Sequence, residues 1–120
     1  MTMNEVIRDL EGLKANVVPD QTKMKWIASV DGLVSLQIHK DDEAVSYAIP
    51  DDADKELLLK APFDDIYALY CSAMVDFYNR EYNSYNFSVQ LFNDRLEEYK
   101  AYYIQRNRPC KANNFRNVMG

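Results

Sequence analysis

The sequence predicts an all-α fold, a bundle of three to four helices with a small irregular or β-hairpin insert around residues 41–60. Apolar residues recur at helical spacing in several stretches of the chain, and residues that end helices separate those stretches. The composition, 48% hydrophobic and 28% charged, is that of an ordinary globular protein. A chain of 120 residues fits one domain, with a core that needs no disulfide or metal.

The first expected helix begins with a capping box, in which Thr2 is the N-cap and Glu5 reaches back to it. It should run to about Ala15 and end before Pro19, because the residue before a proline avoids the α region. Asp20 should cap the second helix, where Gly32 is a weak point that costs about 1 kcal/mol relative to alanine. The buried stripe of this second helix is Met24, Ile27, Val30, Val34 and Ile38, widened by Trp26 and Leu33.

Residues 41–65 are strongly acidic, with nine carboxylates against two lysines. Residues 44–49 alternate weakly and end at Pro50, so we expect a loop with at most a small hairpin. A solvated acidic surface is the favoured interpretation of these carboxylates. A calcium-binding loop would need a central glycine, and there is none between residues 33 and 119. A pair of catalytic carboxylates, as in glycoside hydrolases, is an alternative that the sequence leaves open, although no feature of the sequence indicates a pocket for such a pair.

A third helix should begin near Phe63, because Pro62 suits a first helical position and acidic residues follow it. The last helix should run to about Arg106. One unbroken helix from residue 63 to residue 106 would be about 65 Å long, so we expect a break near Tyr82–Asn86. The spacing predicts a buried seam of Val89, Phe92, Leu96, Tyr99 and Tyr103 in the last helix.

The nine tyrosines have two interpretations. Tyr67, Tyr70, Tyr99 and Tyr103 are favoured as core or half-core residues, and a partner interface is the alternative. Tyrosines that stack on single-stranded nucleic acid would need a basic groove, and the surrounding charge is acidic.

Nothing in the sequence predicts an enzyme or a cofactor. Cys71 and Cys110 match no zinc or redox spacing, and we expect Cys71 to be buried. The only histidine, His39, is expected at the surface. A net charge of −5 argues against non-specific nucleic-acid binding, and no specific nucleic-acid partner is expected. No apolar run is long enough to span a membrane, and the first residues do not resemble a signal peptide.

Residues 107–120 are expected to form a flexible basic tail that follows a helical domain of residues 1–106. From residue 104 onward there are four cations and no acidic residue. The acidic middle and the basic tail can attract copies of the chain head to tail, and such contacts can close into a ring. The candidate interface residues are Arg106, Arg108, Lys111, Phe115 and Arg116.

Three segments resemble a family of small prophage proteins from Gram-positive bacteria, the phage head–tail connector (adaptor) proteins. They are residues 20–32 (DQTKMKWI, then VDG), 56–67 (ELLLKAPFDDIY) and 76–93 (DFYNREYNSYN, then LFN). The chain departs from the family's pattern at Arg80, where we expect a glycine. With arginine there the third helix can run on, so the position of its end is open.

The resemblance implies a helical, non-enzymatic protein that docks as a ring beneath the portal. Its implied partners are the phage portal protein, a neck or tail-completion protein, and copies of itself. Its implied location is the host cytoplasm during assembly and then the neck of the virion. The alternative is a prophage-encoded helical adaptor or regulator that is not part of the virion.

Overall fold

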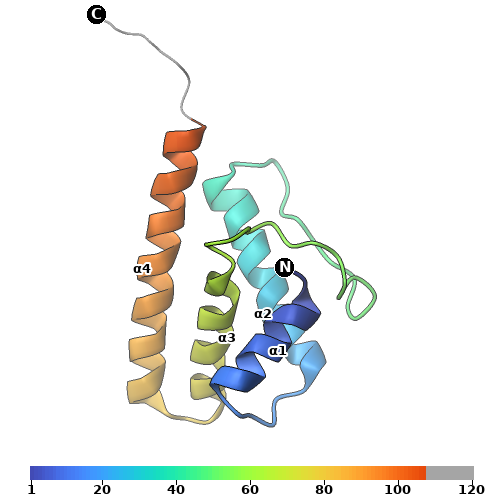
Figure 1. Ribbon diagram of the computed structural model, residues 1–120, viewed down its shortest axis with the longest axis vertical. Coiled ribbons are helices and arrows are strands. Elements are labelled where there is room, and N and C mark those ends of the chain that lie inside the picture. Colours follow the sequence, from blue (N-terminus) through green and yellow to red (C-terminus); the bar gives the residue numbers. More distant parts are fainter. Residues whose placement is uncertain (108–120) are drawn as a thin grey trace, which may run out of the picture.

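Four α-helices make up the fold of residues 1–107, the part of the chain that this computed structural model describes (Figure 1). They are α1 (Met3–Leu13), α2 (Asp20–Leu33), α3 (Asp65–Tyr78) and α4 (Tyr82–Arg106), with a π-helical turn, η1 (Val34–Ile38), directly after α2. Within residues 1–107 there is no β-strand, so the expected insert is irregular rather than a hairpin. The prediction of an all-α bundle is confirmed.

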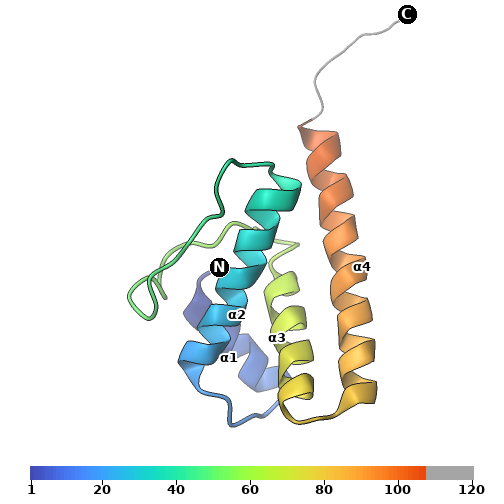
Figure 2. The ribbon, with the colours of Figure 1, turned by 180° about the vertical axis from the view of Figure 1, so that it is seen from behind.

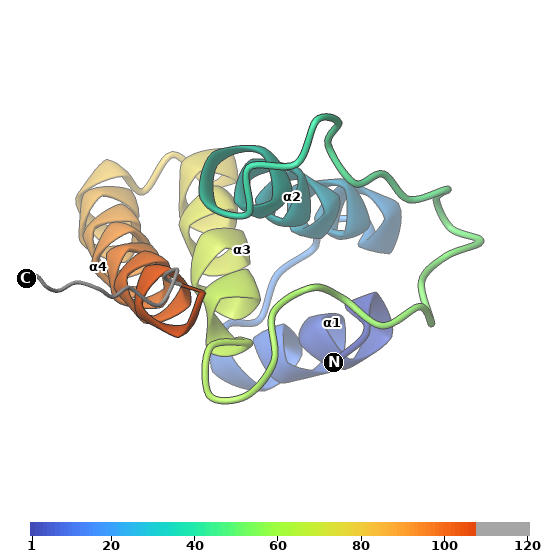
Figure 3. The ribbon, with the colours of Figure 1, turned by 90° about the horizontal axis from the view of Figure 1, so that it is seen from above.

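The helix α3 lies at the centre of the molecule and contacts each of the other three α-helices. Seen from above, α4 lies on one side of α3, and α1 and α2 lie on the other (Figure 3). The view from behind shows the same arrangement, with α4 packed along α3 (Figure 2). The core therefore forms around α3, and α4 keeps one long face outside it.

The capping box at the start of α1 is present as predicted. The backbone N–H of Glu5 donates to Thr2 Oγ1 at 3.3 Å, and the backbone N–H of Thr2 donates to Glu5 Oε1 at 2.8 Å. The helix ends at Leu13 rather than near Ala15, because the backbone of Lys14 is already extended, with φ of −152°. Asn16 then accepts a hydrogen bond from the Val18 N–H and shapes the turn that follows.

The helix α2 begins at Asp20, but the predicted capping role of this residue is wrong. Pro19 is the N-cap, with an extended backbone, and no side chain caps the helix. Proline suits this place because its φ is fixed and the missing N–H would be unsatisfied there. The stripe predicted for α2 is buried along its whole length, and its last two members lie in η1.

The segment between η1 and α3 is irregular but attached to the core. Ala53, Leu57 and Leu59 are buried, and the N–H of Leu57 donates to the Met1 carbonyl at 2.9 Å. The Ile49–Pro50 and Ala61–Pro62 peptide bonds in this segment are cis. Lys40, which follows His39 at the end of η1, has a φ of 61°.

A buried aspartate joins this segment to the helices. The Asp31 side chain on α2 is fully buried and accepts hydrogen bonds from Tyr47 Oη at 2.6 Å, Tyr67 Oη at 2.5 Å and the Leu58 N–H at 3.1 Å. Tyr67 Oη also accepts a hydrogen bond from the Leu59 N–H at 2.8 Å. This Asp31 cluster ties α2, the irregular segment and α3 together, and it takes the place of strand pairing.

The helix α3 starts at Asp65, two residues later than expected. A turn precedes it, in which the N–H of Phe63 donates to the Lys60 carbonyl at 2.8 Å. Pro62 lies inside that turn and not at the first helical position.

The break between α3 and α4 falls at residues 79–81, earlier than the predicted Tyr82–Asn86. Arg80 adopts a left-handed conformation, with φ of 61°. Its N–H donates to the Phe77 carbonyl at 3.0 Å, and the Glu81 N–H donates to the Asp76 carbonyl at 2.8 Å. This pair of bonds is a Schellman motif, so an arginine ends α3 in the way that a glycine usually does.

The predicted seam of α4 faces the core. Phe92 and Tyr99 are buried, and Val89, Leu96 and Tyr103 are half-buried. The interpretation of the tyrosines as core residues is confirmed as well, since Tyr67 and Tyr99 are buried and Tyr70 and Tyr103 are half-buried.

The expectation for His39 is wrong in one respect. This residue is half-buried, not simply at the surface. Its Nε2 lies 2.7 Å from Tyr99 Oη, and its ring stacks on Tyr103 with centroids 4.4 Å apart. Two tyrosines of the α4 seam shield it, and it links the end of η1 to α4.

Candidate interaction surface

Only one of the five predicted interface residues falls within the described part of the chain. Arg106 is exposed, is the last residue of α4, and its guanidinium lies 5.6 Å from the centroid of the Tyr102 ring. Arg108, Lys111, Phe115 and Arg116 lie outside residues 1–107, and so does the predicted tail apart from its first residue.

Large apolar side chains are exposed around the α3–α4 hairpin. Phe77 and Tyr78 end α3, while Tyr82, Phe87 and Leu91 lie on the first half of α4, each between 41% and 67% exposed. Phe77 and Tyr82 touch, with ring centroids 6.2 Å apart. Single exposed apolar residues are common on soluble proteins, whereas a group of them on adjacent elements is typical of an interaction surface.

Two of these residues border a groove between α3 and α4. The groove has a volume of about 510 Å³ and also touches the end of α1. Phe87 is 67% exposed and Leu91, one turn further along α4, is 41% exposed. The residues that line this α3–α4 groove are Lys14, Leu69, Ser72, Asp76, Asn83, Ser84, Phe87, Ser88 and Leu91.

The charged groups in the α3–α4 groove are engaged with each other. Lys14 Nζ lies 2.5 Å from Asp76 Oδ1, and Ser88 Oγ donates to Asp76 Oδ2 at 3.1 Å. Asp76 is 1% exposed, and this network ties α1, α3 and α4 together. Since both carboxylate oxygens are occupied, the groove offers apolar rims and hydroxyl groups. Such a surface suits apolar side chains of another protein more than a charged small molecule.

The other buried charged groups also have partners. Lys23 is 1% exposed, and its Nζ lies 3.2 Å from Glu11 Oε2 and 3.5 Å from Asp20 Oδ1. Asp31 is satisfied by the cluster described above. Buried charges that are paired in this way are typical of structural contacts.

The predicted burial of Cys71 is confirmed, and its surroundings make the thiol a poor nucleophile. The side chain is fully buried, and burial raises its pKa to about 12, against a smaller opposite effect of the Lys23 charge.

Residues 1–107 contain no group of three or more His, Cys, Asp or Glu side chains that could hold a metal ion. Within the same residues, none of the helices has the length and apolar character to cross a membrane.

Sequence reasoning missed Phe87 and Leu91. The search for helical periodicity selects the buried seam of α4, and these two residues lie off that seam. A large apolar residue outside the seam of an otherwise polar helix face is the signal that could have found them.

No protein-family model matches this chain, and comparison with curated proteins and with solved structures gives no match either. The α3–α4 groove and its apolar surroundings are therefore the main guide to function.

Proposed function

We propose that this chain is a structural phage protein, a head–tail connector that docks beneath the portal during virion assembly. The observation that carries the proposal is the α3–α4 groove, where Phe87 and Leu91 expose apolar surface beside a fully paired ion network. This surface supports a protein-binding role. The resemblance of residues 20–32, 56–67 and 76–93 to connector proteins indicates which partner this surface would bind, namely the portal protein.

In this role the α3–α4 groove receives apolar side chains of the portal or of a neighbouring copy. Burying a phenylalanine or leucine side chain contributes about 1.5–3 kcal/mol. Aromatic anchors at the centre of an interface commonly carry most of its binding energy. The remaining partners are a neck or tail-completion protein, and the location is the host cytoplasm followed by the virion neck. No chemical step and no cofactor belong to this function.

Purified phage particles provide the direct test. Mass spectrometry of particles from the induced prophage should find the chain in stoichiometric amounts, and its gene should lie between head and tail genes. If the chain is abundant in the lysate and absent from the particles, the alternative of a non-virion adaptor or regulator is the better function.

A paired substitution tests the groove itself. Phe87→Ser with Leu91→Ser should weaken binding to the portal protein of the same prophage at least about tenfold, because two apolar anchors are lost. Ile104→Ser is the matched control, since Ile104 is 50% exposed on the same helix and lies outside the α3–α4 groove.

Circular dichroism should show the same helix content for both variants, as all three side chains are exposed. Portal binding by the groove variant at the wild-type level would place the docking surface elsewhere.

A further inference from the structure

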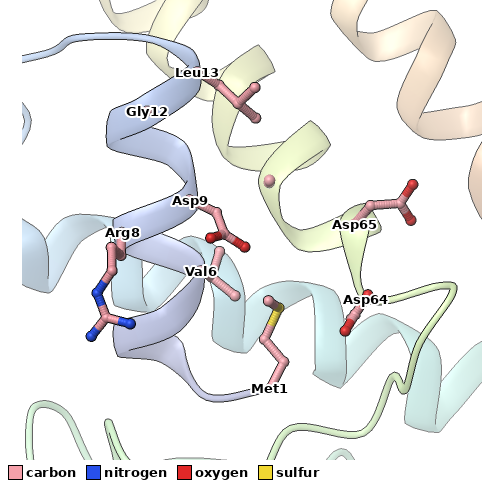
Figure 4. Close-up of a pocket in the computed structure, with 9 residues that line it drawn as sticks. Met1, Val6, Arg8, Asp9, Gly12, Leu13, Asp64 and Asp65 are labelled. Carbon is pink, nitrogen blue, oxygen red and sulfur yellow. The ribbon is translucent and has the colours of Figure 1, made fainter.

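A second hollow lies between α1 and α3, with a volume of about 480 Å³. Figure 4 shows that the side chain of Met1 points into this hollow, toward Val6. The residues that line this α1–α3 pocket are Met1, Val6, Arg8, Asp9, Gly12, Leu13, Asp64, Asp65 and Ala68. The lining therefore combines apolar side chains with three acidic ones and one arginine.

Two of the three acidic side chains of the α1–α3 pocket have no cationic partner within residues 1–107. Asp65 pairs with Arg95, whose Nε lies 3.1 Å from Asp65 Oδ1. Asp9 and Asp64 make no ion pair with any described residue, and Asp64, the N-cap of α3, makes no side-chain capping bond. Figure 4 shows both carboxylates facing the gap between the helices, while the guanidinium of Arg8 points away from α3.

The rest of the chain contains a segment of complementary chemistry. Residues 108–120 include three cations and no acidic residue, and they place Phe115 directly before Arg116. Residues 1–107 hold the other 11 basic residues and all 19 acidic ones, which gives them a net charge of −8. A cation with a neighbouring aromatic ring matches a pocket that pairs unpartnered carboxylates with apolar walls.

The segment begins close enough to reach this pocket. The Arg106 guanidinium lies over Tyr102, and the Tyr102 ring is 5.0 Å from the ring of Phe63, the residue before Asp64. The Arg106 side chain at the end of α4 is therefore connected through Tyr102 and Phe63 to Asp64, which lines the α1–α3 pocket. The nine residues from Asn107 to Phe115 span up to about 30 Å when extended.

We propose that residues 108–120 dock in the α1–α3 pocket of their own chain. Phe115 contacts the apolar side chains of Met1 and Leu13, and Arg116 pairs with Asp9 and Asp64. The segment's own pocket is favoured over that of another copy because a short tether gives an effective concentration of about millimolar. Docking covers the cationic segment and keeps it from the acidic surfaces of other copies. The inference does not depend on the connector role.

Photo-crosslinking of the full-length chain tests the docking. Phe115 is replaced by p-benzoylphenylalanine, and equal amounts of unlabelled and nitrogen-15-labelled protein are mixed at low micromolar concentration before irradiation. The expected cross-links join residue 115 to residues 1–13 or 64–68, with both peptides of one isotope. Cross-links to other surfaces would overturn the proposal. Cross-links of mixed isotope would assign the site to a second copy and overturn docking within one chain.

Charge-matched variants show whether the carboxylates of the pocket are responsible. Asp9→Asn with Asp64→Asn should lower the cross-link yield about fivefold, as expected for the loss of two exposed ion pairs. Asp42→Asn with Asp51→Asn removes the same charge from exposed residues outside the pocket, and should leave the yield unchanged. An equal fall in both variants would indicate general electrostatic attraction and contradict the pocket. Portal binding is measured separately, so failure here leaves the proposed connector role standing.

Discussion

Asp31 determines how the irregular segment is attached to the helices. It is fully buried and has three hydrogen-bond donors, two of them tyrosine hydroxyls. A buried carboxylate is tolerated only when it is hydrogen-bonded in this way. Tyr67 has a double role, because its hydroxyl donates to Asp31 and accepts from the Leu59 N–H.

Tyr67→Phe should lower the free energy of unfolding by about 1–3 kcal/mol, because it leaves both Asp31 and the Leu59 N–H short of a buried partner. Tyr47→Phe removes only one donor at a half-buried position, where water can replace it, so its cost should be smaller. Urea unfolding followed by circular dichroism measures both. A Tyr47 variant less stable than the Tyr67 variant would contradict this account of the Asp31 cluster.

At the scale of single residues, the sequence predicts local contacts and misses distant ones. The capping box of α1 links Thr2 and Glu5, so the residue types and their spacing are enough to predict it. Asp31 meets Tyr47 and Tyr67 across 16 and 36 residues of chain. No local pattern predicts such a meeting, because it depends on how the irregular segment folds over α2.

At the scale of elements, α2 and η1 form one continuous helical segment with a buried face, and Gly32 lies near their junction. A Cβ atom added at Gly32 would lie 3.9 Å from Ala44 Cβ and 4.0 Å from the Val45 carbonyl oxygen, both ordinary contact distances. The irregular segment therefore lies against α2 without needing the glycine.

Gly32→Ala should raise the free energy of unfolding by about 0.5–1 kcal/mol, because alanine is the better helix former and fits the space. Gly12→Ala in α1 is the matched comparison, since a Cβ there meets nothing within 4 Å. Thermal or urea unfolding should give similar gains for both. If Gly32→Ala destabilises the protein while Gly12→Ala does not, the contact with Ala44 and Val45 is tighter than described.

Helix existence was predictable here, and helix ends were less so. The apolar stripe of α2 and the seam of α4 follow from period alone. The end of α3 depends on the backbone of Arg80 and on two hydrogen bonds that cross the turn. The asparagines near residues 83–86 suggested a later break, but the Schellman motif forms before the chain reaches them.

At the scale of the whole molecule, the candidate surface was predicted only in part. The sequence directs attention to the positive charge at the end of the chain, where Arg106 is the one candidate interface residue that lies within the described residues. The α3–α4 groove depends on which face of α4 stays uncovered. That outcome follows from the packing of α4 along α3, which no pattern within either helix determines.

Stability should fall as pH rises above about 9. Burial raises the pKa of Cys71 from its usual 9.0 to about 12. Burial and then the Asp31 carboxylate raise the pKa values of Tyr47 and Tyr67 above their usual 10.0. The unfolded chain loses these protons near pH 9–10 while the folded chain keeps them, so the stabilisation is complete below this range and is lost as pH increases.

Urea unfolding under reducing conditions at about pH 8 and about pH 10.5 measures this effect. The Tyr67→Phe variant should lose less stability between the two values than the wild-type chain does. A wild-type midpoint that does not change over this range would contradict the expected coupling of folding to these protons.

The two corners at Lys40 and Arg80, both with φ of 61°, have a consequence for the unfolded chain. A glycine at either position would remove the strain of the left-handed backbone conformation, but it would also give the denatured ensemble more conformations to lose on folding. With no glycine between residues 33 and 119, this long stretch starts from a stiffer ensemble. Local torsional strain in the native state is thus offset by a smaller loss of chain entropy when the protein folds.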